Sequence, residues 1–283
     1  MSVWFVTGAS RGFGADITDK ALEAGHHVVA TARHPQSILD RFPSQGDRLI
    51  ALPVDVTIEA QIATAVDIGE SRFGPLDVVV NNAGRGLLSA VEEASDAAAR
   101  AVYDTNVFGT LNVIRAVLPS MRARRSGRII NLSSIGGFVG SPGWGIYNST
   151  KFAVEGFSEA LRKELEPLGI AVVLVEPGYF RTDFLDSSSL HTELTVIDDY
   201  AGTAGATRKT AATVNHLQPG DPAKAAAVIL EMATTDHPPA RIQLGADAFT
   251  AVAAKLARVA DEQSRWRTAS LGTDHDDVAT LHH

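Results

Sequence analysis

Residues 3–14 read VWFVTGASRGFG, a short apolar run that passes directly into a glycine-rich loop. The run Val3–Thr7 predicts a buried strand, because β-branched and aromatic residues favour that structure. The loop glycines let the backbone turn tightly and approach a phosphate, whose charge then meets the free N–H groups of a following helix, expected near 15–24. The spacing G-x3-G-x-G differs from the GxGxxG of dinucleotide loops. The position between a first strand and a helix makes this loop a candidate phosphate site.

The same alternation of short apolar runs and longer helical patterns continues along the chain. Further strands are predicted at His27–Thr31, Leu49–Val54, Leu76–Val80, Arg128–Leu132 and Ala171–Val175, with Ile242–Leu244 as a candidate seventh. Helical patterns lie near 58–72, 95–124 and 148–167. Apolar runs without alternation indicate strands buried on both faces, as in a parallel sheet. We therefore expect an α/β fold: a single doubly wound Rossmann-type domain over 1–283, with about seven parallel strands and helices on both faces.

Composition narrows the class of protein. The chain has 283 residues, 45% of them hydrophobic, which is enough for one substantial core. The net charge of −8 argues against nucleic acid as a partner. The absence of cysteine excludes disulfides and fits a cytoplasmic location, and the nine histidines show no metal-ligand spacing. Neither a signal peptide nor a membrane span is expected. Residues 281–283 could be native or the remnant of a tag, so no function is inferred from them.

Tyr147 and Lys151 lie four residues apart in YNSTK, and Ser134 precedes the tyrosine in NLSSIGG. On a helix, positions i and i+4 share one face. A phenol is a poor acid or base near neutrality because its pKa is about 10. A nearby cation lowers that pKa, whereas burial raises it. By itself such a pair is usually a surface pair; with the serine and the glycine loop, it suits acid–base chemistry on an alcohol or a carbonyl.

In this order, the motifs of residues 2–182 resemble the short-chain dehydrogenase/reductase family. They comprise TGASRGFG at 7–14, Asp55-Val56, NNAG at 81–84, Asn106, Ser134, Tyr147 with Lys151, Pro177-Gly178 and Thr182. Beyond them, GDPAKAA at 220–226 and a tail with Trp266, Ser270 and Thr273-Asp274 are similar to the subgroup of 17β-hydroxysteroid and retinol dehydrogenases. The resemblance implies hydride transfer between a nicotinamide cofactor and a carbonyl or secondary alcohol.

The resemblance also implies roles for four catalytic residues. Tyr147 would be the general acid or base, and Ser134 would hold the substrate oxygen. Lys151 would lower the pKa of Tyr147 and bind the nicotinamide ribose. Asn106 would hold a water between the lysine and solvent, or else satisfy a helix kink. Ser133 is the competing serine, with a backbone hydrogen bond as its structural alternative.

The implied cofactor-binding set spans the whole resemblance. It consists of Gly8, Ser10, Arg11, Gly12, Phe13, Gly14, Arg33, Asp55, Val56, Asn82, Ala83, Gly84, Tyr147, Lys151, Pro177, Gly178 and Thr182. NAD-selective enzymes carry an acidic residue at the end of the second strand. Ala32 stands there in this chain, followed by Arg33, whose guanidinium can pair with a 2′-phosphate, while Arg11 could add a second cation. NADP(H) is therefore predicted over NAD(H).

Residues 183–219 are rich in Ser, Thr, Ala and Gly and directly follow the sixth strand. Ligands bind beyond the carboxyl ends of such strands, so this segment is a predicted substrate-binding lid, with an ordinary mobile insertion as the alternative. Its apolar residues, such as Phe184 and Leu190, favour an apolar or bulky small-molecule substrate. Asp198, Asp199 and Tyr200 could contact that substrate or solvent.

Three further expectations concern assembly, surface charge and alternative functions. The apolar stripes near 95–124 and 150–167 suggest, by analogy with the family, a homodimer or homotetramer. The basic cluster at Arg122, Arg124, Arg125 and Arg128 is interpreted as a solvated helix end. A non-catalytic protein that senses the cofactor on the same fold remains the alternative function. A nucleotide-sugar epimerase would need a different loop spacing and a larger C-terminal domain.

Overall fold

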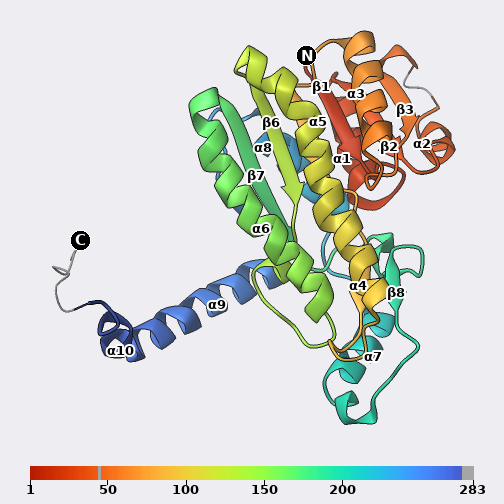
Figure 1. Cartoon of the computed structure of the whole chain (residues 1–283). Coiled ribbons are helices and arrows are strands. Elements are labelled where there is room, and N and C mark those ends of the chain that lie inside the picture. The colour runs from red at the N-terminus through yellow and green to blue at the C-terminus, as the bar shows by residue number, and fades with distance from the viewer. Residues whose placement is uncertain (44–45, 276–283) are drawn as a thin grey trace.

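Seven parallel strands form the central sheet of the computed structural model, which describes residues 1–43 and 46–275 (Figure 1). In chain order they are β1 (Val3–Thr7), β2 (His27–Ala32), β3 (Leu49–Pro53), β4 (Val78–Asn81), β6 (Gly127–Leu132), β7 (Ile170–Pro177) and β9 (Arg241–Leu244). Across the sheet the order is β3-β2-β1-β4-β6-β7-β9. The order changes direction between β1 and β4, the switch point at which doubly wound sheets bind ligands. The predicted α/β sheet is confirmed.

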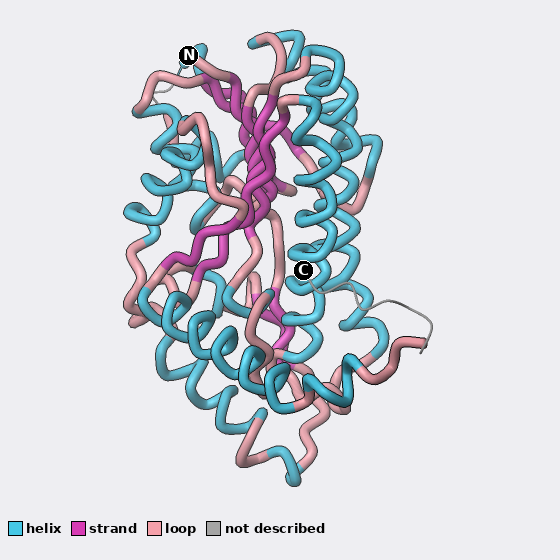
Figure 2. Tube along the Cα trace, turned by 90° about the vertical axis from the view of Figure 1, so that its left-hand side faces the viewer, coloured by secondary structure: helices cyan, strands magenta, loops and turns pink. Residues whose placement is uncertain are grey.

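Helices cover both faces of this sheet, which Figure 2 shows nearly edge-on. One face packs against α1 (Gly12–Glu23), α2 (Gln36–Arg41) and α8 (Pro222–Thr234). The other packs against α3 (Glu59–Phe73), α5 (Gly109–Arg124) and α6 (Gly145–Leu165). The side chains of β1 divide between the two cores, because successive residues of a strand point to opposite faces: Trp4 and Val6 to the first core, Val3 and Phe5 to the second.

The helical pattern predicted over 95–124 is interrupted. α4 (Asp96–Tyr103) begins at an N-cap whose Ser95 hydroxyl accepts a hydrogen bond from the Ala98 N–H. A five-residue π-helical turn, Asp104–Phe108, joins α4 to α5. Such turns insert one residue into the helix and are frequent at functional sites. This turn contains Asn106. The alternative prediction, that Asn106 lies at an irregularity of a helix, therefore agrees with the structure.

The segment 183–219 contains regular structure that the sequence pattern did not predict. Its strand β8 (Leu190–Thr192) pairs in parallel with β5 (Gly86–Leu88), and its helix α7 is Ala204–Val214. Short 3-10 turns lie at Asp183–Leu185 and Asp198–Tyr200. The segment is thus packed on the loop that follows β4.

Three polar contacts join this segment to residues 92–93. The buried carboxylate of Glu93 forms an ion pair with Arg208 at 2.6 Å and also accepts a hydrogen bond from the Ile197 N–H. The Tyr200 hydroxyl donates to Glu92 at 2.5 Å. Tyr200 was expected to contact substrate or solvent, and in the structure its hydroxyl contacts Glu92 in the loop after β5.

The basic cluster at the end of α5 is not simply solvated, which corrects the sequence-based interpretation. Arg124 donates to the Leu76 carbonyl and Arg125 to the Pro167 carbonyl. Arg128 donates to the carbonyls of Met232 and Thr235, each at 2.6 Å. These carbonyls lie at the ends of helices and loops, where unpaired C=O groups need donors. Three of the four arginines therefore tie elements together.

The C-terminal part departs from the body of the molecule. α9 (Ala246–Arg265) runs outward, and α10 (Arg267–Leu271) lies at its far end (Figure 1). Of the predicted subgroup tail, Trp266 lies between the two helices and Ser270 lies in α10, whereas residues 281–283 lie outside the described residues. Among the described helices, none has the length and apolar character needed to cross a membrane.

Candidate active site

Thr7 and Asn82 fix the glycine loop between β1 and β4. The Thr7 hydroxyl accepts hydrogen bonds from the N–H groups of Asn82 and Ala83, both at 3.0 Å. The Asn82 amide donates back to the carbonyls of Thr7 and Gly8, at 2.9 and 3.1 Å. Gly8 has a φ of 65°, and a Cβ there would lie 3.0 Å from the Ala83 Cα. Glycine is therefore required at this position.

A cleft of about 500 Å³ opens over this loop at the carboxyl edge of the sheet. Twelve of the predicted cofactor residues line it: Gly8, Ser10, Arg11, Gly12, Phe13, Arg33, Asp55, Val56, Asn82, Ala83, Gly84 and Thr182. Gly14 does not line the cleft, because it packs on the Gly8 carbonyl so closely that any Cβ would collide with it. Asn81 lies outside the cleft: its amide donates to Asn131 at 2.8 Å and joins β4 to β6.

The two predicted phosphate-binding arginines differ in their surroundings. Arg33 is exposed at the end of β2, and across the described part of the chain no hydrogen bond or ion pair engages its guanidinium. Arg11 instead donates to the Ser188 carbonyl at 3.0 Å and to the Ser189 hydroxyl at 2.8 Å, so it holds the segment after β7. Ala32, buried, brings no carboxylate to this end of the cleft. Of the two arginines, Arg33 is the one available to a ligand.

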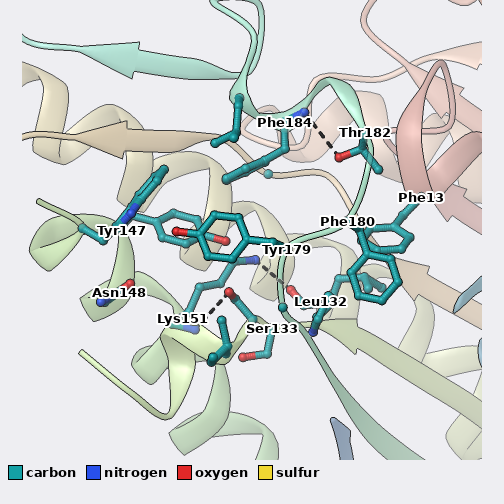
Figure 3. A pocket seen from close by; sticks show the side chains of 18 of the residues that line it. Phe13, Leu132, Ser133, Tyr147, Asn148, Lys151, Tyr179, Phe180, Thr182 and Phe184 are labelled. Atoms are coloured by element: carbon teal, nitrogen blue, oxygen red, sulfur yellow. Dashed lines mark hydrogen bonds between the residues drawn. The ribbon is translucent and has the colours of Figure 1, made fainter. Parts of the chain in front are cut away.

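A second cavity, of about 200 Å³, adjoins the cleft and contains Ser134, Tyr147, Lys151, Pro177 and Gly178 (Figure 3). The two spaces share lining residues, including Phe13 and Thr182. α6 carries both the tyrosine and the lysine, with Lys151 Nζ 5.9 Å from the centre of the Tyr147 ring. Ser134 begins a 3-10 turn, where its hydroxyl accepts a hydrogen bond from the Gly136 N–H. The structure thus brings the predicted serine, tyrosine and lysine to one cavity.

Burial controls the acidity of both titratable groups. It raises the pKa of Tyr147 to about 12, although the neighbouring Ser134 hydroxyl lowers it in part. Burial also lowers the pKa of Lys151 to about 8, against the effect of the Glu155 carboxylate. The Lys151 ammonium donates to the Leu132 carbonyl at 2.7 Å. We expected Lys151 to lower the pKa of Tyr147. Within the protein itself, burial instead raises that pKa.

Asn106 lies beside the site and lines neither cavity. Its amide donates to the Arg85 carbonyl at 2.9 Å and to the Thr150 hydroxyl at 3.0 Å, and its Oδ1 accepts from the Arg85 N–H at 2.9 Å. These bonds clamp the π-helical turn to the strand edge after β4. Both polar atoms of the Asn106 side chain are therefore engaged in hydrogen bonds within the protein. The resemblance implied that Asn106 holds a water, and that role would need an atom other than these two.

A buried acidic group behind Lys151 was missed by sequence reasoning. Glu155 lies one turn further along α6, 6% exposed, and its Oε1 has no hydrogen-bond partner among the described residues. Burial raises its pKa to about 7; the adjacent hydroxyl of Ser133 and the guanidinium of Arg241 act in the opposite direction, and Glu176 and Glu159 add to the increase. Arg241 reaches Glu155 at 3.4 Å. The i, i+4 spacing from Lys151 was a signal that could have identified this residue.

Aromatic rings form the wall of the second cavity; Phe184 was named in the predicted lid, whereas Trp144 and Tyr179 were not predicted. Trp144 lies 5.6 Å from the ring of Tyr147, and Phe184, from the segment after β7, lies 5.5 Å from it. Tyr179 lines the same cavity. Gln218 is 2% exposed, and its Oε1 has no partner among the described residues. The cavity is therefore mostly apolar with a few polar groups, which is typical of small-molecule sites.

Asp183, Asp186 and His216 form the one group of potential metal ligands found in the described ranges. The Asp186 carboxylate already accepts hydrogen bonds from Asn215 at 2.7 Å and from His216 at 3.1 Å. The group is partly exposed, and its hydrogen bonds account for its arrangement.

Comparison with known proteins identifies the family. A model of the short chain dehydrogenase family matches residues 2–193. The chain belongs to the short-chain dehydrogenase family. An oxidoreductase of Botryotinia fuckeliana is 37% identical over 96% of this dehydrogenase and 98% of its own length. A 3-ketodihydrosphingosine reductase of Bacteroides thetaiotaomicron is 39% identical over 85% of this chain and 86% of its own.

Solved structures agree with this assignment. A short-chain dehydrogenase of Streptomyces avermitilis is 40% identical, with a TM-score of 0.89 over 97% of this dehydrogenase and 100% of that chain. A serine dehydrogenase in complex with NADP+ is 27% identical, with a TM-score of 0.73 over 86% of this chain and 94% of its own. A Burkholderia phymatum structure in complex with NAD, 23% identical, covers 99% of this chain and 98% of its own with a TM-score of 0.78, which supports the fold. This short-chain dehydrogenase is thus an oxidoreductase whose relatives bind a nicotinamide cofactor.

Proposed function

We propose that this short-chain dehydrogenase transfers a hydride between NADP(H) and a carbonyl or secondary alcohol with an apolar or bulky body. The observation that carries the proposal is the convergence of Ser134, Tyr147 and Lys151 in a cavity continuous with the glycine-loop cleft. When bound, the nicotinamide would supply or accept the hydride.

The side chains of the second cavity would handle the proton. In carbonyl reduction Tyr147 would give its hydroxyl proton to the substrate oxygen, while the Ser134 hydroxyl would hold that oxygen by a hydrogen bond. In alcohol oxidation the tyrosine would take the proton back. Lys151 would bind the ribose and stabilise the phenolate as the proton leaves.

The wall of the cavity supports the proposed substrate class. Trp144, Tyr179 and Phe184 offer flat apolar surfaces, and Leu185 extends them. A sugar phosphate would need cationic groups, whereas Lys151 and Arg85 are the only Lys or Arg side chains among the described residues that line this cavity. A ketone or alcohol with a hydrocarbon body fits these surfaces.

Arg33 and Ala32 support NADP(H) over NAD(H). A carboxylate at Ala32 would repel a 2′-phosphate, and removal of Arg33 would take away its guanidinium partner. We expect Ala32→Asp/Arg33→Ala to reverse the preference, with a loss of about 10–100-fold in kcat/KM for NADPH, since one charge-assisted hydrogen bond is worth about 1.5–3 kcal/mol. Arg11→Ala is the matched control and should change the preference less, because its side chain engages Ser188 and Ser189. An unchanged NADPH/NADH ratio in the double variant would refute the cofactor assignment.

The activity itself is tested by following NADPH oxidation, through the absorbance of the reduced nicotinamide, with a panel of aliphatic and cyclic ketones. Turnover of at least one ketone, lost in Tyr147→Phe, is the expected result. The alternative function, a cofactor sensor without catalysis, predicts NADPH binding without turnover of any member of the panel. The homodimer or homotetramer, the lid role of 183–219 and the cytoplasmic location stay predictions.

A further inference from the structure

The helix α9 exposes most of its length. Only Ala248 and Val252, near its start, are buried on the body of the molecule. From Leu256 through the end of the described chain at His275, every residue is exposed. Figure 1 shows α9 running outward from the sheet and its covering helices.

Apolar side chains recur along α9 with a coiled-coil spacing. The positions are separated alternately by three and four residues and hold Phe249, Val252, Leu256, Val259, the polar Gln263, and Trp266, which directly follows the end of α9. This spacing places one stripe along one face of a helix, and such a stripe packs against a partner helix. Four of its members are large and exposed: Phe249 at 68%, Leu256 at 55%, Val259 at 43% and Trp266 at 67%. We call this stripe the α9 seam.

An isolated helical segment of this length is marginal in water, because most helix stability in proteins comes from packing an apolar face. Among residues 1–43 and 46–275, the part of α9 beyond Val252 has no such packing. The solved S. avermitilis relative aligns with 97% of this chain, a share reached only if most of α9 is included. The seam therefore needs an occupant from outside the chain.

The charges of α9 indicate which occupant it is. Along the helix three acids, Asp247, Asp261 and Glu262, balance three bases, Lys255, Arg258 and Arg265. A helix that lies on anionic lipid is enriched in Lys and Arg, so this balance disfavours a membrane surface. Lys255 and Glu262 are seven residues apart and flank the seam on the same side, at equivalent heptad positions. Two opposite charges so placed are complementary to a reversed copy of themselves.

We propose that the α9 seam binds a second copy of this chain, with the two α9 helices packed antiparallel. With the twofold axis between Ala257 and Arg258, Leu256 lies opposite Val259 of the second copy, and Phe249 opposite its Trp266. Lys255 then approaches Glu262 of the second copy, and the same pair forms again by symmetry. The two bodies stand at opposite ends, with about 35 Å along the helix axis between the starts of the two helices at a rise of 1.5 Å per residue.

Cross-linking tests the register, because the chain has no cysteine of its own. Purified Leu256→Cys and Val259→Cys proteins are mixed and oxidised mildly. The expected product is the mixed disulfide dimer, in excess over either homodimer, since Leu256 faces Val259 across the seam. Ala254→Cys, on the opposite side of the helix, is the matched control and should cross-link only by collision. A parallel pairing would give Leu256→Cys homodimers, and that result, or no excess over the control, overturns the proposal.

Charge reversal tests the same pairing without cross-links. Lys255→Glu and Glu262→Lys should each weaken self-association about tenfold by light scattering, and the double reversal should restore it, because each reversal turns two attractions into repulsions. Leu256→Glu should halve the particle mass, with Ala254→Glu unchanged. Equal circular dichroism and melting of all variants shows that folding is intact. If the Leu256→Glu mass is unchanged, or if wild type sediments with phosphatidylcholine–phosphatidylglycerol vesicles and Leu256→Glu does not, the second copy is not the occupant.

Discussion

The acidity of Tyr147 is set by opposing effects at a single hydroxyl. Burial raises its pKa to about 12, and the hydrogen bond of Ser134 is the interaction within the chain that lowers it. Acid–base catalysis near neutrality requires a pKa closer to the working pH. A positive charge placed beside the phenol has to supply the rest. In the proposed mechanism the serine would therefore contribute to proton transfer as well as hold the substrate.

Removal of the Tyr147 hydroxyl tests this proton transfer directly. We expect Tyr147→Phe to lower kcat by about 10²–10⁴-fold, the usual scale for the loss of an acid–base group. The Kd for NADPH, measured by fluorescence titration, should stay within a factor of about three, because the ring packing is retained. Tyr179→Phe, which removes a hydroxyl from the same cavity but leaves Tyr147 in place, should keep most of the activity. Near wild-type turnover of Tyr147→Phe would remove this residue from the mechanism.

We expect Glu155 to raise the upper pH limit of the site through its effect on Lys151. The carboxylate raises the pKa of Lys151, and burial lowers it to about 8. Above that pH the ammonium loses its proton, so kcat/KM should fall on the alkaline side. Because Glu155→Gln removes the carboxylate, the Lys151 pKa should drop further and the alkaline limb should move to lower pH. The measurement is kcat/KM against pH, with the more exposed Glu159→Gln as control; an alkaline limb that stays in place contradicts the argument.

At the scale of elements, the strands were predictable from sequence because each is a short apolar run buried on both faces. The seven runs from Val3 to Leu244 all appear, with ends that move by a few residues. The π-helical turn was not predictable, because an added residue in a helix changes no apolar pattern. β5 and β8 have three residues each, too few for a periodic signal, and their pairing depends on contacts distant in sequence.

Some residues of the candidate site were likewise predictable from the sequence, and others were not. Ser134, Tyr147 and Lys151 were found because spacing along one helix and a family motif identify them. Arg11 was given a phosphate-binding role because its sequence neighbours are loop glycines, whereas its contacts are Ser188 and Ser189. Trp144 and Gln218 were missed because their place at the cavity follows from tertiary packing, and Glu155, which lines neither cavity, was missed despite its i, i+4 spacing from Lys151.

The buried ion pair between Glu93 and Arg208 should stabilise the segment 183–219, whose Phe184 and Leu185 line the second cavity. The pKa of Glu93 is lowered to about 2, chiefly by its hydrogen bond with Arg208. Its stabilisation is therefore present above the ordinary carboxyl pKa of about 4.5 and is lost as the pH falls towards 2. Arg208→Ala leaves a buried charge unpaired and should cost about 3 kcal/mol at pH 7.

Hydrogen exchange of α7 and urea denaturation at pH 7 and pH 3 measure this effect. Arg208→Ala should increase exchange in α7 at pH 7, and its difference from wild type should shrink at pH 3. Arg115→Ala, whose partner Glu59 is exposed and 3.4 Å away, is the matched control, with an expected cost within about 0.5 kcal/mol. Equal stability of wild type and Arg208→Ala at pH 7 would show that the pair contributes nothing.

At the scale of the whole molecule, the cofactor should act as a stabiliser. A ligand at 100 times its Kd stabilises the folded chain by about 2.7 kcal/mol. For a chain of this size that corresponds to an increase in Tm of roughly 5 °C or more. We expect NADPH to raise Tm more than NADH at equal concentration. The order should reverse in Ala32→Asp/Arg33→Ala, as measured by differential scanning fluorimetry.

The contact between Glu93 and Arg208 spans 115 residues of chain, and the β5–β8 pair joins the same two regions. Contacts between residues so far apart in sequence form late in folding, because the entropy cost of closing the long loop comes before the favourable energy of the contact. A chain still emerging from the ribosome could complete β1 to β4 and the glycine loop, yet its cavity for substrate would have no cover until the residues around Arg208 had been made. Nucleotide recognition would therefore mature before substrate recognition during synthesis, and a nascent chain could be stabilised by cofactor while it is still unable to react.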